Sequence, residues 1–543
     1  MTKFSLILSA LIVAATAACY AQDQPKEAKQ EEPPKLEIPE ITIVGKKAIT
    51  LPFARKGEIF DVTSYTAPMP DSTLLGTPPS MSLLRGSLPR YQNEDRRWRL
   101  SADGLFGSFG TVQAKGIADY KGDTWGVTGD IGFGSSNGHT TNSSSSSLEM
   151  GADAHSIFRT DNNILKSFSG SAGLNYTHDS YGMFGITSSD VTRRNNVVGI
   201  DTRIGTLNRE GSVLDLDVGA KFSSVKDAAS SGDSSVSAVS PSIIASYGLP
   251  VRSFFVSSSF SYIASSLAYE HPAQTPSATN FNINASWAAN ARTHVALGAL
   301  LAGGSDAAGN TVHLVMPSAM AEFLTDSTQR LTISYLPRLG IVPYDEQLGK
   351  IPYFARESRI SAERRPVFLG STLEFRTRKY SLAFDGSYAY YLEKEVIVSG
   401  NGDIHPEYPE ASIVELGGRG TMRDDIAGNL SCGAKLSFAR GRGLSTQLPM
   451  IPVFDLTAGA EREFGVVTGW TSIDFQTPKN TDLAGTQSIP SVVLMNLGAR
   501  TIVAHRFLLG AEIRNLFNVK YDWWKDYAAP GIGFDLTAKV NIE

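Results

Sequence analysis

From Trp98 to the end of the chain, apolar and polar residues alternate with a period of two, without a helical interruption. Successive side chains of a β-strand point to opposite faces, so each such segment predicts a strand with one apolar and one polar face. A soluble β-sandwich or barrel also alternates, but several hundred residues of this pattern exceed one soluble β domain. The clearest runs are Leu214, Leu216, Val218, Ala220 and Phe222, then Phe254, Val256, Phe260 and Tyr262, and finally Phe534, Leu536, Ala538, Val540 and Ile542.

Short polar connections recur roughly every 35 to 50 residues, which leaves room for two strands of about ten residues and one longer loop. Ten such turns with both barrel termini on the same side predict 2 × (10 + 1), or about 22 strands, with about 18 as a lower bound. The fold class is therefore all-β: a transmembrane, antiparallel, up-and-down barrel of the outer-membrane type. The turns lie near Gly122, Asn162, Glu210, Pro250, Arg292, Ser327, Arg378, Asp424, Phe464 and His505.

Five connections rich in Ser, Gly, Asn and Pro are predicted to be the long loops that face the external medium. They are Ser135–Ser147, Lys226–Ser237, Ala302–Asn310, Ser399–Ala411 and Thr477–Ser488.

The N-terminus has the layout of a secretory signal peptide, residues 1–21, with cleavage expected after Ala21. Lipidation of Cys19 is the alternative, although Thr16 stands where such sites usually carry Leu. Residues 22–97 are predicted to be a periplasmic, partly disordered segment, and residues 98–543 the transmembrane barrel. Removal of Cys19 leaves Cys432 as the single cysteine, so no intramolecular disulfide is expected.

Several functional classes lack support in the sequence. A net charge of -5 gives no basic excess for nucleic acid. HExxH, CxxC and a phosphate-binding glycine loop are all missing, so no metal and no cofactor is expected. His155, His294, His405 and His505 fall in different hairpins with no catalytic motif around them, which argues against an enzyme.

Several segments, taken in order, resemble the TonB-dependent receptors of the bacterial outer membrane. The resemblance is clearest at the C-terminal end and implies a barrel of about 22 strands, solute uptake, and a location in the cell outer membrane of a Gram-negative-type bacterium. The segments are Gly107–Thr111, Tyr335–Arg338 through Arg365, Pro409–Gly417, Leu448–Pro449, Ala511–Tyr521 and Ala529–Gly531.

Glu40–Lys47 resembles the TonB box of this family, through which a periplasmic energy transducer pulls on the receptor. The contact strand would be Ile41, Thr42, Ile43 and Val44, joined to the transducer by β-augmentation.

The chain departs from the family in two places. Only about fifty residues separate the box from the barrel, too few for a folded plug domain. Glu543 stands where many barrels carry a terminal aromatic residue that the barrel assembly machinery recognises. This machinery and outer-membrane lipid are further expected partners.

Two sets of side chains are candidate sites. Arg356, Arg359, Arg364 and Arg365 could meet an anionic solute in the lumen, the alternative being ion pairs with Glu357, Glu363 and Glu374. Trp523, Trp524 and Tyr527 suit a girdle at the lipid headgroups, the alternative being packing within a loop.

The leading functional hypothesis is passage of an unidentified solute through a barrel without a plug. The alternative is a non-transporting scaffold or surface-exposed binding protein.

Overall fold

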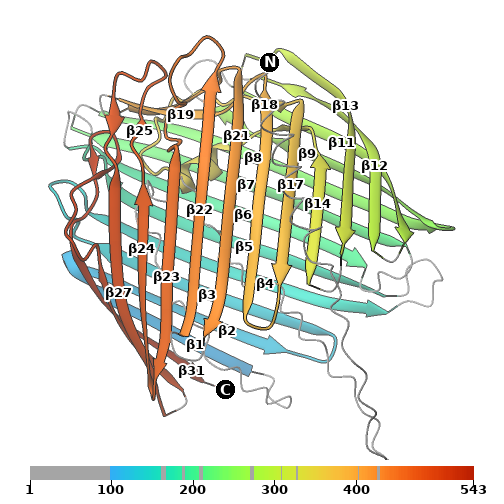
Figure 1. The fold of residues 1–543 in the computed structure, drawn as a ribbon. Helices are drawn as coiled ribbons and strands as arrows, with labels where there is room; N and C mark the ends of the chain where they lie inside the picture. Colours follow the sequence, from blue (N-terminus) through green and yellow to red (C-terminus); the bar gives the residue numbers. More distant parts are fainter. Residues whose placement is uncertain are drawn as a thin grey trace, which may run out of the picture. The chain divides into compact units, whose positions relative to one another are not determined.

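The structure, a computed structural model, describes residues 98–542 apart from 160–166, 186–189, 207–211, 231, 269–273, 291, 307, 326–327, 401–402, 425–427 and 505. Most of this part of the chain is β-strand (Figure 1). The barrel strands are β1 (Trp98–Gly107), β2 (Thr111–Lys121), β3 (Trp125–Ser136), β4 (Ser145–Arg159), β5 (Ser167–Gly182), β6 (Thr192–Thr206), β7 (Val213–Ala229), β8 (Gly232–Val251), β9 (Phe254–Ala264), β11 (Ser277–Asn290), β12 (Thr293–Ser305), β13 (Thr311–Leu324), β14 (Gln329–Tyr335), β17 (Val367–Arg376), β18 (Tyr380–Tyr391), β21 (Ala411–Asp424), β22 (Gly428–Gly441), β23 (Phe454–Phe464), β24 (Val467–Gln476), β27 (Val492–Val503), β28 (Phe507–Arg514) and β31 (Gly533–Ile542).

The remaining elements belong to the connections. They are η2 (Ser108–Gly110), β10 (Ser266–Ala268), β15 (Arg338–Gly340), α2 (Tyr344–Lys350), β16 (Glu363–Arg365), β19 (Val396–Gly400), β20 (Asp403–Glu407), β25 (Lys479–Asn480), β26 (Ser488–Ile489), β29 (Asp522–Trp524) and β30 (Tyr527–Ala528). None of the helices among the described residues has the length and apolar character needed to cross a membrane.

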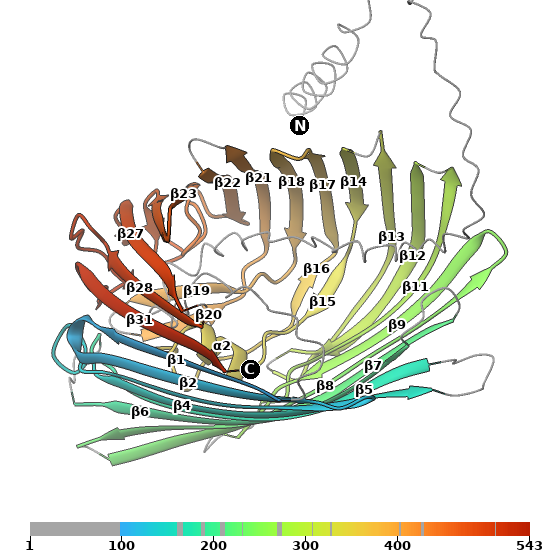
Figure 2. The same ribbon diagram turned by 90° about the horizontal axis from the view of Figure 1, so that it is seen from below.

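The main sheet closes on itself. In the described part of the chain it contains 23 strands, of which β10 is a short addition to β8, and the other 22 form a ring of antiparallel neighbours. The last strand pairs with the first, Leu100 opposite Ile542 and Gly107 opposite Asp535. Figure 2 views this ring, with α2, β15, β16, β19 and β20 lying inside it. The expected transmembrane barrel of 22 antiparallel strands is confirmed.

Each of the ten predicted turns falls at a junction between two consecutive barrel strands, with Pro250, Asp424 and Phe464 among the last two residues of the preceding strand. Because antiparallel strands alternate in direction, all ten lie at one end of the barrel, with the start of β1 and the end of β31. One predicted long loop is wrong: most of 226–237 is strand, since β7 continues to Ala229 and β8 begins at Gly232. The serines there alternate with inward apolar residues, Val225 and Val236, which are 0% and 2% exposed, so the segment extends the hairpin rather than forming a loop.

The two faces of the wall differ as the alternation predicts. On β31, Phe534, Leu536 and Ile542 are 45%, 45% and 53% exposed on the outside, whereas the intervening Asp535 is 2% exposed. Inward charges are paired between neighbouring strands, as in Lys435–Glu415 at 2.7 Å and Arg514–Asp535 at 2.7 Å. An apolar outside and an ion-paired inside are what a wall between lipid and a polar lumen requires.

Outward aromatic residues collect at the end that carries the ten turns. Trp98, Tyr120 and Trp125 form a chain of rings with centroid separations of 4.6 and 4.9 Å. Phe158 stacks on Phe168 at 5.0 Å. Aromatic rings favour the membrane–water interface, so this belt marks one edge of the lipid-facing band.

The position of the aromatic belt predicts how the cost of an outward-facing charge depends on its depth in the membrane. Ile200 lies six residues along β6 from Thr206, the partner of Phe168, and about 15 Å above the aromatic belt for a strand tilted by about 40°. We therefore expect Ile200→Arg to lower the free energy of unfolding by about 2 to 4 kcal/mol. Leu216 pairs with Ile204, only about 5 Å above the belt, and Leu216→Arg should cost about 0 to 1 kcal/mol.

Both variants can be compared by reversible unfolding in lipid vesicles, with the luminal substitution Asp217→Asn as the control. Equal costs at Ile200 and Leu216 would contradict the assigned depth.

Candidate functional site in the barrel lumen

The connection between β14 and β17, residues 336–366, folds into the ring and is called the luminal loop (Figure 2). Its helix α2 begins after Pro343 and carries Asp345 and Glu346 in its first turn and Lys350 in its last, the charge order that the helix dipole favours. Beside it, β15 pairs with β16. The backbone of Leu339 in β15 donates to and accepts from the amide of Asn280 on the wall strand β11.

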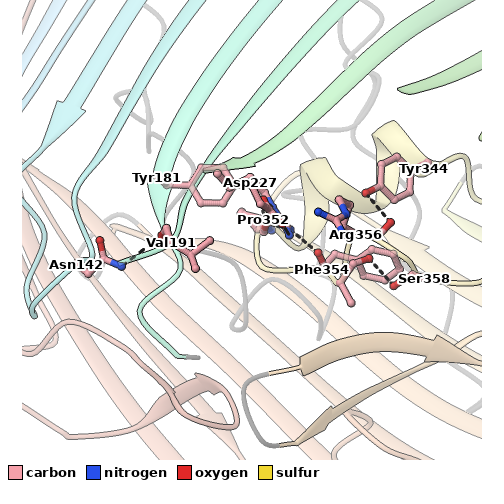
Figure 3. A network of polar contacts seen from close by, with 11 residues as sticks. Asn142, Tyr181, Val191, Asp227, Tyr344, Pro352, Phe354, Arg356 and Ser358 are labelled. Carbon is pink, nitrogen blue, oxygen red and sulfur yellow. Dashed lines mark hydrogen bonds and ion pairs between the residues drawn. The ribbon is translucent and has the colours of Figure 1, made fainter. Parts of the chain in front are cut away.

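A buried arginine holds the luminal loop to the wall strands β6 and β7. Arg193 on β6 is 2% exposed and donates to both carboxylate oxygens of Asp227 on β7, at 2.7 and 2.8 Å. Its remaining nitrogen donates to the carbonyls of Pro352, at 3.2 Å, and Phe354. The hydroxyl of Tyr181 also donates to Pro352 (Figure 3). We call this set of contacts the Arg193 latch; it uses a charge-assisted fork, the stronger class of hydrogen bond.

A second ion pair fixes α2 itself. The ammonium of Lys221, on the inner face of β7, lies 3.0 Å from the carboxylate of Asp345, whose side chain is 4% exposed. At the same end of the helix, the Tyr344 amide donates to the hydroxyl of Ser265, and the Tyr344 side chain is fully buried. The luminal loop is thus attached to the wall at both α2 and the segment that follows it.

Apolar side chains from many connections meet in one buried group at the long-loop end, here called the mouth cluster. It comprises Met183, Val191, Val225, Val236, Ala238, Leu267, Tyr344, Leu348, Ile351, Tyr353, Phe354, Ile360, Ile404, Met450, Ile489, Trp523, Trp524, Tyr527 and Ala529. These residues come from strands and connections spread around the ring, so their burial draws the external loops inward over the lumen.

The structure corrects the girdle interpretation of Trp523, Trp524 and Tyr527. Their side chains are only 5%, 1% and 0% exposed, and Tyr527 stacks on Tyr353 of the luminal loop at 4.2 Å. A ring enclosed by protein cannot lie among lipid headgroups, so packing within the loops, the alternative, describes these three residues. The aromatic belt is formed instead by residues at the strand ends described above.

The four candidate arginines lie together in the luminal loop, but most are engaged. Arg364 forms a two-pronged ion pair with Glu393, at 2.7 and 2.9 Å. Arg365 lies over the ring of Phe368, 4.3 Å from its centroid. Arg356 contacts Glu357 at 2.7 Å, whereas Arg359 is exposed, near the Asp306 carboxylate. These contacts fit the ion-pairing alternative, although the partner of Arg364 is Glu393 and not Glu363.

A titratable group connects the luminal loop to the next long connection. Gln347 of α2 donates to the Glu395 carboxylate at 2.9 Å, and the Tyr408 hydroxyl lies 3.4 Å from the same oxygen. Burial raises the pKa of Glu395 to about 7; Lys394 opposes this shift and Glu363 adds to it. Among the described residues nothing donates to Gln347 Oε1, and a neutral Glu395 carries the proton that could do so.

Sequence reasoning did not identify Arg193, which lies in an alternating strand like many others. Its one signal is relational: Asp227 is its direct partner in the β6–β7 register, with both side chains facing inward. That pairing, and the approach of Pro352, require the register and the path of the luminal loop, neither of which a motif encodes.

The latch generates a first prediction for this site. Replacing the buried Arg193 by Gln leaves the partly buried Asp227 carboxylate without its cation and should loosen the luminal loop by about 3 to 5 kcal/mol of local stability. Hydrogen exchange should accelerate in residues 336–366 while the barrel strands remain protected. Arg356→Gln, which removes only the contact with Glu357, is the matched control and should leave exchange unchanged; acceleration in both variants would argue against a specific latch.

Glu395 predicts a pH dependence. Its folded pKa is raised from 4.5 to about 7, so the neutral form stabilises the folded loop. That contribution is complete below a pH of about 4.5 and is lost as the pH rises through about 7. Proteolysis of the luminal loop should be faster at a pH of about 8 than at about 5, and Glu395→Gln should remove the difference. A difference that persists in this variant would assign the pH response to other groups.

Of the comparisons with known proteins, the one with solved structures shows the fold. No protein-family model matches the sequence. No curated protein matches it either. The iron transporter FrpB of Neisseria meningitidis aligns over 82% of each chain with a TM-score of 0.67 and 10% identity. The copper transporter OprC aligns over 82% of this chain and 80% of its own, with a TM-score of 0.63 and 12% identity.

The ferric yersiniabactin uptake receptor FyuA of Yersinia pestis gives a TM-score of 0.60 at 10% identity, over 83% of this chain and 80% of its own. These structural neighbours are transporters and receptors, not enzymes. The chain therefore has the 22-stranded barrel fold of the TonB-dependent outer-membrane receptors.

Proposed function

We propose that this protein lies in the outer membrane of a Gram-negative-type bacterium and mediates the passage of a solute across it. The observation that carries the proposal is the closed 22-strand ring with an apolar outside and an ion-paired interior. Such a ring encloses a lumen wide enough to need filling or to conduct. The structural similarity to proteins described as iron and copper transporters also supports solute passage.

We propose further that the chain's own loops restrict the lumen in place of a plug domain. The luminal loop spans from Asn280 on one wall to the Arg193 latch on another, and the mouth cluster joins it to the other external connections. Arg359, exposed on this loop, and Arg356 beside it are the candidate contacts for an anionic solute.

Energy coupling is a separate part of the proposal. Residues Ile41, Thr42, Ile43 and Val44 would form the strand that a TonB-type transducer engages by β-augmentation. They lie outside the described residues, so the support is the sequence resemblance and the receptor-like barrel. The barrel assembly machinery and lipid are the partners that insertion of such a barrel needs.

The mouth cluster also favours a second function. A lumen covered by well-packed loops suits a scaffold that does not transport and instead presents its outer surface to a binding partner. Tyr344, Phe354 and Tyr527 are 0% exposed, which indicates a closed resting arrangement. Transport and scaffold differ in one measurable property, the conductance of the barrel.

The test is single-channel conductance in planar bilayers with three forms of the protein. These are the full chain, a form without residues 22–97, and a form in which a short Gly-Ser linker replaces residues 341–361. We expect little conductance from the full chain and large, stable openings from the linker form. Openings only after removal of 22–97 would make the N-terminal segment the stopper. Equal openings in all forms would refute restriction by the loops, and silence in all would favour the scaffold.

A further inference from the structure

The outer face of β5, β6, β7 and β8 changes from apolar to polar and then to positively charged toward the long-loop end of the barrel. These four strands lie side by side (Figure 1). Toward the long-loop end, the last apolar outward row is Tyr176, Val198, Phe222 and Val239. The next outward row is His178, Asn196, Ser224 and Ser237. The row beyond it is Ser180, Arg194, Lys226 and Ser235.

Exposure assigns the last of these rows to the outside of the wall. Arg194 is exposed between Arg193 and Asn195, which are 2% and 5% exposed. The side chain of Lys226 is 46% exposed, and its neighbour Val225 is fully buried. The inward residues at this level pack against the luminal loop, so the cations that alternate with them point away from the lumen.

The height of the row can be estimated from the aromatic belt. Phe168 and His178 are ten residues apart on β5, which corresponds to about 25 Å along the barrel axis for strands tilted by about 40°. The lipid-facing band of such barrels is about 25 Å tall. The apolar-to-polar change at His178 therefore falls at the far edge of the band. Arg194 and Lys226, about 5 Å higher, lie at the level of the lipid headgroups.

Arg194 and Lys226 are direct partners in the β6–β7 register. Like charges directly opposite each other on neighbouring strands are destabilising unless an anion lies between or above them. Lys226 forms an ion pair with Asp233 on the neighbouring strand, at 2.6 Å. Arg194 adds a second positive charge that this one carboxylate does not balance. Ser180 and Ser235, at the two ends of the row, supply hydroxyl donors.

We propose that this row binds a phosphate group on the headgroup of a lipid in the outer leaflet. A phosphorylated glycolipid would place its acyl chains against Val198 and Phe222 and its phosphate between the Arg194 guanidinium and the Lys226 ammonium. The continuity of the row with the lipid-facing band selects a lipid phosphate over a phosphate in solution. The inference rests on the proposed membrane orientation but not on solute passage.

The test titrates detergent-solubilised full-length protein with lipid A and, separately, with dephosphorylated lipid A, and follows thermal unfolding. Lipid A should bind the unmodified protein more tightly than the dephosphorylated form does. The double variant Arg194→Gln and Lys226→Gln should bind lipid A about 25-fold more weakly, or about fivefold for each cation lost. Its affinity for dephosphorylated lipid A should not change.

The matched control is Arg292→Gln with Arg506→Gln, two exposed arginines at the turn end of the barrel. Its lipid A affinity should equal that of the unmodified protein. An equal loss in both double variants, or no loss in either, would overturn the proposal. So would stabilisation by inorganic phosphate alone that equals the effect of lipid A. Conductance of the Arg194 and Lys226 variant should match that of the unmodified protein, so failure here is distinguishable from failure of the transport proposal.

Discussion

The architecture depends on the satisfaction of backbone hydrogen bonds where no water is available. A strand edge exposed to lipid would leave a row of N–H and C=O groups unpaired, at several kcal/mol for each group. The pairing of β31 with β1, from Leu100 opposite Ile542 to Gly107 opposite Asp535, removes that edge. Closure then obliges every barrel strand to have one lipid face and one luminal face, and the remaining features of the molecule follow from this division.

The division separates neighbouring residues into different environments. Arg193 and Arg194 are adjacent in the chain, yet one is buried against the luminal loop and the other is exposed on the outer wall. The same holds for Val225 and Lys226 on β7. The wall also differs in height: β5 to β8 have 16, 15, 17 and 20 residues, whereas β14 has 7. The longer strands supply the inner surface on which α2 and the segment after it are anchored.

Local chemistry made much of this predictable. Alternation indicated the faces of β7, β9 and β31, and turn composition placed all ten short connections. Composition was misleading where polarity alone was used: the serines of 226–237 indicated a loop, but a strand accepts serine on its exposed face. For the aromatic residues at 523–527 the sequence left both lipid headgroups and loop packing open, because an aromatic side chain near a strand end suits an interface and a buried loop core equally well.

The sequence by itself determined the fold class, a strand number of about 22 within the range 18 to 22, and the inward or outward direction of the side chains named above, because each follows from a period of two and from the recurrence of short polar turns. Tertiary structure alone decided that Arg193 meets Pro352, that Arg364 pairs with Glu393 rather than Glu363, and that Tyr353 stacks on Tyr527. These contacts join residues far apart in the chain through the register of the ring and the path of a long loop. Their energies depend on which partners closure brings together, and no local pattern records that.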